Sequence, residues 1–394
     1  MLSTPFSPWP SFTEQEIDAV SSVLRSNKVN YWTGQEGRSF EKEFAQFCNS
    51  KYAVALANGT LALDLALKVL NISAGDEVIV TSRTFIASIS SIINAGATPI
   101  FADVELDSQN ISARTITEVI STKTKAIICV HLAGWPCEMD EIMDLAEMRN
   151  LFVIEDCAQA HGTKYKGKPV GSIGHIGAWS FCQDKIMTTG GEGGMFTTNN
   201  EQFWRNAWAY KDHGKSYAAV YETQHPEGYR WLHETFGTNW RLTEMQSAIG
   251  RIQLTRMSAW TKCRTDNAHQ IRRICQKYHW LIVPEVPHYI DHAYYKCYIQ
   301  IDINKLPADY SRDKIINDIV NQGVPCFSGS CSEVYKEKAF DDTQLRPNLP
   351  LKNAELLGKN SLMFLVHPTL TTDEIDKTCR ILISVFDKIE QMTK

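Results

Sequence analysis

Short apolar runs alternate with helical patterns through the first half of the chain, and this alternation most constrains the fold. Each run is apolar throughout rather than at every second residue, which is typical of strands buried on both faces of a sheet. Helices between such strands provide the crossovers that parallel strands need. We therefore expect an α/β fold with a mostly parallel sheet flanked by helices. The expected strands are residues 52–57, 78–81, 98–102, 126–130 and 151–154.

A different pattern follows in the last third of the chain. We expect a long helical stretch over 242–278, a strand with one exposed face over 294–301, and a final helix from Thr372. These elements predict a smaller α+β domain packed against the first one. The expected domains are residues 1–255, with an N-terminal helical arm, and residues 256–394.

Charge and hydropathy exclude several classes of protein. Hydrophobic residues make up 43% of the 394 residues, and the net charge is −5. The sequence contains no run of like charges. This argues against a protein that binds nucleic acid or an anionic membrane through a basic face. No apolar stretch approaches the ~18 residues of a membrane span. The start, Met1 to Pro5, lacks the basic region of a secretory signal. We expect a soluble, cytoplasmic protein.

The cysteines do not suggest a metal site or a disulfide framework. There are eleven of them, an odd number, and no Cys-x-x-Cys pair occurs. Zinc sites and disulfide-rich folds both need regular cysteine spacing. We therefore expect reduced thiols and no bound metal.

Two ionisable residues follow predicted strands, where ligands of parallel sheets bind. Asp156 comes just after the apolar run 151–154, and Lys185 lies between a second apolar run and the turn Gly190-Gly-Glu-Gly-Gly194. A lone lysine is usually a solvated surface group. A lysine beside glycines, which allow a close approach of backbone or ligand, can lose solvation and form a Schiff base.

Pyridoxal phosphate requires such a lysine, a carboxylate for its ring nitrogen, and a phosphate cradle. Asn58-Gly59-Thr60 joins a strand to a helix, whose amino end favours an anion, and Ser180 could add a hydroxyl. Phe85 is placed to lie over a flat ring. Taken singly, Asn58-Gly59-Thr60 is more often a helix cap, Asp156 a surface strand end, and Phe85 a core residue. Their order on successive strands favours a pyridoxal phosphate site.

The chain resembles the DegT/DnrJ/EryC1/StrS family of sugar aminotransferases, within fold type I of the pyridoxal phosphate enzymes. The resemblance extends from about residue 28 to the end and is strongest between residues 50 and 255. The matching motifs are Asn58-Gly59-Thr60-Leu-Ala-Leu63, Thr84-Phe85-Ile-Ala87, Glu155-Asp156-Cys-Ala-Gln159-Ala-His-Gly162, Ser180-Phe181 with Lys185, Glu192-Gly-Gly194, and Gly237-Thr-Asn239-Trp-Arg241-Leu-Thr-Glu244.

The resemblance implies a role for each matching residue. Lys185 and Asp156 are the expected catalytic residues, as the Schiff-base lysine and the partner of the ring nitrogen. Asn239 is expected to reach the phosphate from a second subunit, which implies a homodimer with shared active sites. The implied cofactor-binding residues are Gly59, Thr60, Phe85, Asp156, Gln159, Ser180, Lys185 and Asn239.

The resemblance also implies a reaction. Relatives with histidine in place of Lys185 are sugar dehydratases, so this chain is expected to transfer an amino group. L-glutamate is the expected donor and a nucleoside-diphosphate-linked keto sugar the acceptor. Thr188-Thr-Gly-Gly-Glu-Gly-Gly194, with one glycine more than the usual signature, favours a 4-keto-6-deoxy sugar and a role in bacterial surface-glycan assembly, such as lipopolysaccharide O-antigen.

Three alternatives stay open from the sequence. One is a 3-keto sugar aminotransferase of the same family, and another is a catalytically silent relative that binds the cofactor or the sugar. The intact set of site residues speaks against the silent relative. The third is an NAD enzyme with a parallel sheet, which is disfavoured because Asn58-Gly59-Thr60 is not a Gly-x-Gly-x-x-Gly turn. The nucleotide is left open among dTDP, UDP and GDP.

Overall fold

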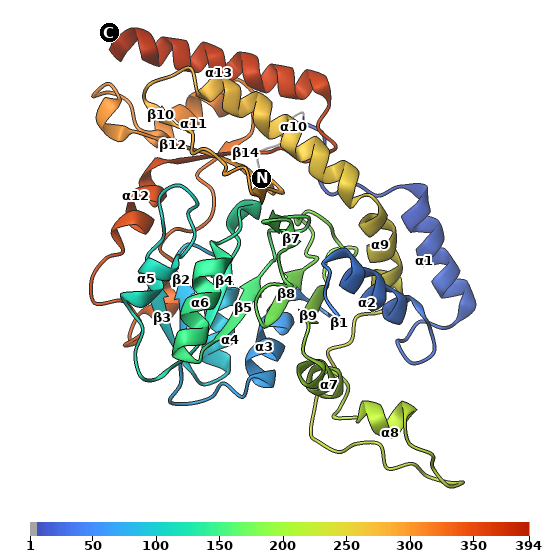
Figure 1. Cartoon of the computed structure of the whole chain (residues 1–394). Helices are drawn as coiled ribbons and strands as arrows, with labels where there is room; N and C mark the ends of the chain where they lie inside the picture. The colour runs from blue at the N-terminus through green and yellow to red at the C-terminus, as the bar shows by residue number, and fades with distance from the viewer. Residues whose placement is uncertain (1–5, 394) are drawn as a thin grey trace.

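The centre of the molecule is a seven-stranded sheet with helices on both faces (Figure 1). It is seen in a computed structural model that describes residues 6–393, so Met1 to Pro5, on which the expectation about a secretory signal rests, lie outside the described residues. The strand order is β1-β9-β8-β5-β4-β2-β3. The strands are β1 (Tyr52–Leu56), β2 (Glu77–Thr81), β3 (Thr98–Ala102), β4 (Thr124–Val130), β5 (Phe152–Asp156), β8 (Ile176–Ser180) and β9 (Gly194–Thr198).

Five neighbouring strands of this sheet, β3, β2, β4, β5 and β8, pair in parallel, which confirms the mostly parallel α/β fold. The exception is β9, which runs antiparallel to both β8 and β1. The connection from β8 to β9, residues 181–193, contains no helix, so the chain returns beside β8 in the opposite direction. Lys185 lies on this connection.

Both faces of the sheet are covered, which explains why its strands are apolar throughout. In β4, Ile128 packs in the core cluster that includes α3 and α4, whereas Ile127 packs in the cluster that includes α6. Neighbouring residues of a strand point to opposite faces, so every position meets a helix. The helices of this part are α1 (Glu14–Ser26), α2 (Glu36–Phe47), α3 (Gly59–Val69), α4 (Ala87–Asn94), α5 (Ala113–Thr117), α6 (Met139–Arg149), α7 (Glu201–Tyr210) and α8 (Tyr217–Tyr221), with a 3₁₀ turn at Leu132–Gly134.

A second sheet is antiparallel and has the order β10-β12-β14-β13. Its strands are β10 (Leu281–Ile282), β12 (Cys297–Ile301), β13 (Cys326–Phe327) and β14 (Ser361–Phe364). The remaining helices are α9 (Glu244–Thr255), α10 (Met257–Cys275), α11 (Arg312–Val320), α12 (Lys352–Asn360) and α13 (Thr372–Thr393), with 3₁₀ turns at Ile303–Lys305, Val334–Lys336 and Lys338–Phe340. A small third sheet joins β11 (Ile290–Asp291), β6 (Lys164–Tyr165) and β7 (Lys168–Pro169). The domain boundary between residues 255 and 256 stays a prediction.

The helical stretch expected over 242–278 is confirmed, and it consists of two helices, α9 and α10, which meet at Arg256. The guanidinium of Arg256 donates to the Glu16 carboxylate at 2.7 Å and to the Thr13 hydroxyl at 2.7 Å. The N-terminal helical arm therefore holds the junction between the two helices.

The strand expected over 294–301 is shorter and more buried than its alternating pattern suggests. β12 begins at Cys297, and four of its five residues are buried. Cys297, Ile299 and Ile301 pack in the core cluster with α10 and α13. On the other face, the Gln300 amide donates to the Leu106 carbonyl in the loop after β3. A polar residue facing another part of the chain looks, in sequence, like one facing water.

None of the helices within residues 6–393 is both long and apolar enough to cross a membrane.

Candidate active site

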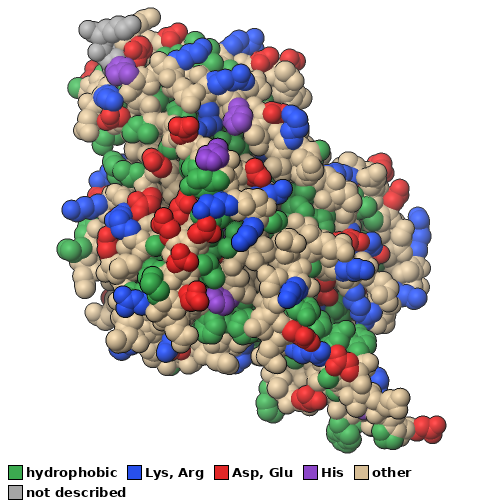
Figure 2. Space-filling view, viewed as in Figure 1, with side chains coloured by type: hydrophobic (Ala, Val, Ile, Leu, Met, Phe, Trp, Pro, Cys, Tyr) green, Lys and Arg blue, Asp and Glu red, His purple; other side chains and the backbone are tan. Residues whose placement is uncertain are grey.

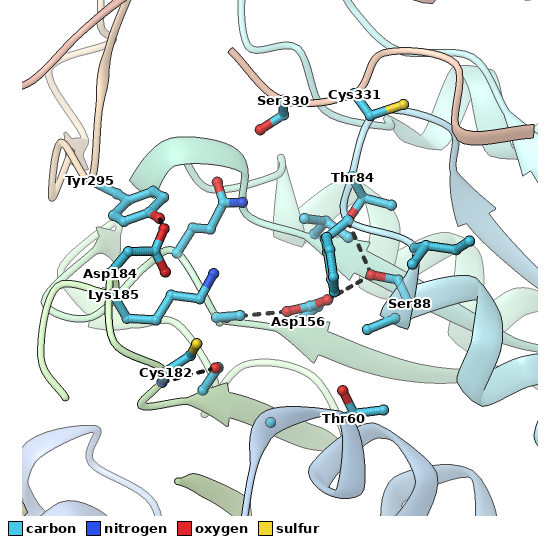
Figure 3. Close-up of a pocket in the computed structure, with 18 of the residues that line it drawn as sticks. Thr60, Thr84, Ser88, Asp156, Cys182, Asp184, Lys185, Tyr295, Ser330 and Cys331 are labelled. Carbon is cyan, nitrogen blue, oxygen red and sulfur yellow. Dashed lines mark hydrogen bonds between the residues drawn. The ribbon is translucent and has the colours of Figure 1, made fainter. Parts of the chain in front are cut away.

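A cavity of about 920 Å³ lies at the carboxyl ends of β2, β5 and β8, and residues near β12 and β13 also line it (Figure 3). The fold thus opens the cavity at the sheet edge where ligands of parallel sheets bind. Seven of the eight predicted cofactor-binding residues line it: Gly59, Thr60, Phe85, Asp156, Gln159, Ser180 and Lys185.

The eighth residue, Asn239, does not line this cavity. It is exposed and pairs through its backbone with Asp212 in the segment after α7. Its own chain therefore does not bring Asn239 to the other predicted site residues.

Asp156 is the last residue of β5 and is buried. Its carboxylate accepts a hydrogen bond from the Ser88 hydroxyl at 2.9 Å and one from the Ala158 backbone N–H at 3.1 Å. Burial raises the pKa of Asp156, while these hydrogen bonds and the positive charge of Lys185 act in the opposite direction. The structure thus places an acid in the cavity with two donors that favour its ionised form.

Ser88 is a site residue that the sequence analysis missed. It lies in the first turn of α4, and its hydroxyl is 3.0 Å from that of Thr84, just before Phe85. Thr84 itself lies in the bend before α4. The proximity of the two residues was visible in the sequence, but the contact of Ser88 with Asp156 was not.

Lys185 reaches into the same cavity from the connection between β8 and β9 (Figure 3). Its amine lies 5.4 Å from the centre of the Tyr295 ring, and its backbone carbonyl accepts a 2.8 Å hydrogen bond from the Trp9 indole. The Tyr295 hydroxyl donates to the Asp184 carboxylate. Trp9 of the N-terminal arm thus contacts the backbone of Lys185, and Tyr295, just before β12, lies near its amine.

Asn58, Gly59 and Thr60 form the amino end of α3. The Asn58 side chain caps the helix by accepting from the Leu61 N–H at 3.0 Å, so the segment is both a helix cap and a wall of the cavity. A Cβ on Gly59 would lie only 2.5 Å from the Cβ of Ser180. The absence of a side chain therefore lets the helix end pack directly against the end of β8.

The ring-binding candidates also lie in the cavity wall. The Phe85 side chain is 69% exposed, so it is not a core residue, and it lines the cavity. The Gln159 amide oxygen accepts a 2.8 Å hydrogen bond from the Ala133 N–H. This hydrogen bond fixes the Gln159 side chain in the cavity wall, which Asp156 also lines.

These residues fit pyridoxal phosphate. The helix end with Thr60 and Ser180 offers N–H and hydroxyl donors for a phosphate, and the buried Asp156 offers a carboxylate for a ring nitrogen. The exposed Phe85 offers an apolar face for a flat ring, and Lys185 offers the amine.

One group of metal-type ligands, His131, Glu155 and Cys157, is buried within the described residues but does not line the cavity. The His131 ring nitrogen lies 3.0 Å from the Glu155 carboxylate. That carboxylate also accepts backbone N–H groups of Gly171 and Gly174. Its oxygens therefore already have partners in a structural hydrogen-bond network.

Comparisons with known proteins agree with this site. The model of the DegT/DnrJ/EryC1/StrS aminotransferase family matches residues 10–383. GDP-perosamine synthase from Escherichia coli O157:H7 is 44% identical over 248 residues, which are 62% of this chain and 64% of that enzyme. A dTDP-3-amino-3,6-dideoxy-alpha-D-galactopyranose transaminase from Aneurinibacillus thermoaerophilus is 31% identical over 374 residues, covering 92% of this chain and 93% of that one.

Among solved structures, the X-ray structure of the aminotransferase from Psychrobacter cryohalolentis is similar over nearly the whole chain. It has a TM-score of 0.97 and 64% sequence identity, and the match covers 98% of this chain and 100% of that one. The family model, the relatives and the fold agree with the cavity residues. The chain belongs to the DegT/DnrJ/EryC1/StrS aminotransferase family, whose enzymes use pyridoxal phosphate, and it is an aminotransferase of that kind.

Proposed function

We propose that this enzyme transfers an amino group from L-glutamate to a nucleoside-diphosphate-linked 4-keto-6-deoxyhexose, giving a 4-amino sugar for surface-glycan biosynthesis. The observation that carries the aminotransferase chemistry is the meeting of Lys185, Asp156 and the amino end of α3 in one cavity. When bound, pyridoxal phosphate supplies an aldehyde that combines with amines and a ring that takes up the electrons of a neighbouring carbanion.

Each cavity residue has a proposed task. Thr60 and Ser180 bind the phosphate at the amino end of α3, and Phe85 lies on the ring. Asp156 keeps the ring nitrogen protonated, because an ionised carboxylate there favours the cation. Lys185 holds the cofactor and then moves a proton between the α-carbon of the donor and the C4′ atom of the cofactor. Gln159 would lie against the ring near its phenolic oxygen.

The sugar position is inferred from the relatives and from the segment Thr188 to Gly194. The relatives include 4-amino sugar transaminases, which supports amination at C4. The transaminase from Aneurinibacillus thermoaerophilus is named for a 3-amino sugar and supports a second candidate, a 3-keto acceptor.

We also propose that the active form is a homodimer with Asn239 reaching the partner's cofactor phosphate. The segment after α8 projects from the body of the molecule (Figure 1), and the projecting part exposes apolar side chains along its lower edge, beside an acidic one at its tip (Figure 2). Tyr229, Trp231 and Phe236 on this segment are 75%, 83% and 99% exposed. Exposed aromatic side chains such as these are typical of surfaces that bind another protein.

A panel of keto-sugar nucleotides tests the proposal directly. The purified enzyme is incubated with pyridoxal phosphate, L-glutamate and 4-keto or 3-keto sugars on dTDP, UDP or GDP, and NMR assigns the carbon that carries nitrogen in the product. Amination at C4 supports the proposal, and amination at C3 supports the second candidate. Cofactor binding without turnover on any sugar would contradict both.

A further inference from the structure

A second lysine lines the cavity beside Lys185. Lys296 is the residue before β12, and its amine lies 4.7 Å from the centre of the Tyr295 ring, which the Lys185 amine approaches to 5.4 Å. Both amines thus approach the same ring. Lys296 is half-buried, and within residues 6–393 its amine has neither a hydrogen bond nor an ion pair.

Two fully buried cations among the described residues have polar partners. Lys211, fully buried, lies 3.4 Å from the Glu41 carboxylate. Arg83, also fully buried, donates to the Gln109 amide oxygen at 2.9 Å and to the Ser361 hydroxyl at 3.1 Å. The amine of Lys296 contacts the Tyr295 ring but has no hydrogen-bond or ion-pair partner within residues 6–393, which distinguishes it from these two cations.

The charges around Lys296 leave a positive excess. Burial lowers the pKa of Lys296 to about 8; Arg264 and Lys185 act in the same direction, and Asp184 opposes them. One oxygen of the Asp184 carboxylate is already engaged by the Tyr295 hydroxyl. Arg264 is 1% exposed, and two of its guanidinium nitrogens, Nε and Nη2, have no partner within the described residues. An incoming anion would offset this charge.

We propose that Lys296 binds a carboxylate of the amino donor. This inference rests on the proposed function, because it assumes an amino acid as donor. A carboxylate on the carbon that carries the amine must enter the cavity together with that amine, and so come close to Lys185. The diphosphate of a 4-keto sugar nucleotide is attached at C1, across the hexose ring from the reacting carbon. The position of Lys296 near Lys185 therefore favours the donor carboxylate over the diphosphate.

The test measures binding of glutarate, a dicarboxylate with neither amine nor keto group, to the cofactor-loaded enzyme by calorimetry. Lys296→Met should weaken glutarate binding roughly 10- to 100-fold, the loss of a charge-assisted hydrogen bond. Lys296→Arg should retain most of the affinity because it keeps the charge. Lys277→Met removes an exposed lysine just after α10 and serves as the matched control.

A second set of measurements separates the ligands. Lys296→Met should raise the KM for L-glutamate by a similar factor and leave the KM for the keto sugar and the Kd for the free nucleoside diphosphate within about twofold. Weaker nucleotide binding with unchanged glutarate binding would assign Lys296 to the diphosphate and overturn the inference. So would unchanged glutarate binding in Lys296→Met, or a loss in Lys296→Arg equal to that in Lys296→Met. Wild-type enzyme that binds glutarate but aminates no keto sugar would instead count against the proposed function.

Discussion

Replacing Ser88 with alanine should make the ionised form of Asp156 less stable while leaving its carboxyl group in place. The Ser88 hydroxyl is one of two donors to Asp156, at 2.9 Å, and the Ala158 N–H at 3.1 Å is the other. Because Asp156 is buried, water cannot readily replace the lost donor. The variant should therefore raise the pKa of Asp156 further and weaken its hold on a protonated ring nitrogen.

The size of the effect follows from these contacts. A hydrogen bond to a charged group contributes about 1.5–3 kcal/mol, which corresponds to a rate lower by roughly 10- to 100-fold if the reaction depends on that charge. Asp156→Asn removes the charge entirely, and losing a preorganised electrostatic partner costs about 3–4 kcal/mol, or more than roughly 100-fold. We expect the order wild type, Ser88→Ala, Asp156→Asn.

The assay is the half-reaction with L-glutamate, followed by the absorbance of the bound cofactor in a single turnover. Asp156 acts when ionised, so the rate should fall as pH drops through its pKa, and in Ser88→Ala that fall should begin at a higher pH. Ser90→Ala, on the same helix, removes a hydroxyl that makes no side-chain hydrogen bond within residues 6–393 and is the control. A wild-type rate and pH profile in Ser88→Ala would refute the role of this hydrogen bond.

Four further outcomes are expected. Lys185→Ala should abolish transamination while the circular dichroism spectrum and the cofactor binding persist; turnover at even a few per cent of wild type would place the proton carrier elsewhere. Gly59→Ala should weaken cofactor binding, because its Cβ would lie 2.5 Å from that of Ser180 and displace the end of α3; an unchanged Kd in a cofactor titration would contradict this cradle. Asn239→Asp should lower cofactor occupancy by repelling the phosphate, and mixing it with Lys185→Ala should restore activity, since one site of the heterodimer has both residues intact; verified heterodimers without activity would show that Asn239 serves its own chain. Asp156→Asn should raise the melting temperature of the cofactor-free protein at neutral pH, because burial raises the pKa of Asp156 and penalises its ionised form there; the gain should vanish at acid pH, where Asp156 is protonated, and an equal gain at every pH would point to another cause.

The sequence by itself determined the central sheet and the order of the residues along its edge. Strands that are apolar at every position must be covered on both faces, as Ile127 and Ile128 of β4 are by different helices. Residues directly after such strands lie at one edge of the sheet. The positions of Asp156 and Lys185 in the sequence were therefore enough to predict that they line one cavity.

Only the tertiary structure decided what surrounds these residues. The bond from Ser88 to Asp156 spans 68 positions, and the contact from Tyr295 to Asp184 spans 111. Local patterns report which face of an element is apolar, but not which distant segment covers it, so β12 was expected to be half-exposed. Nothing in the sequence distinguishes Lys296 from an ordinary surface lysine. It becomes a candidate ligand because folding places it in the cavity beside Lys185, half-buried and without a hydrogen bond or ion pair within residues 6–393.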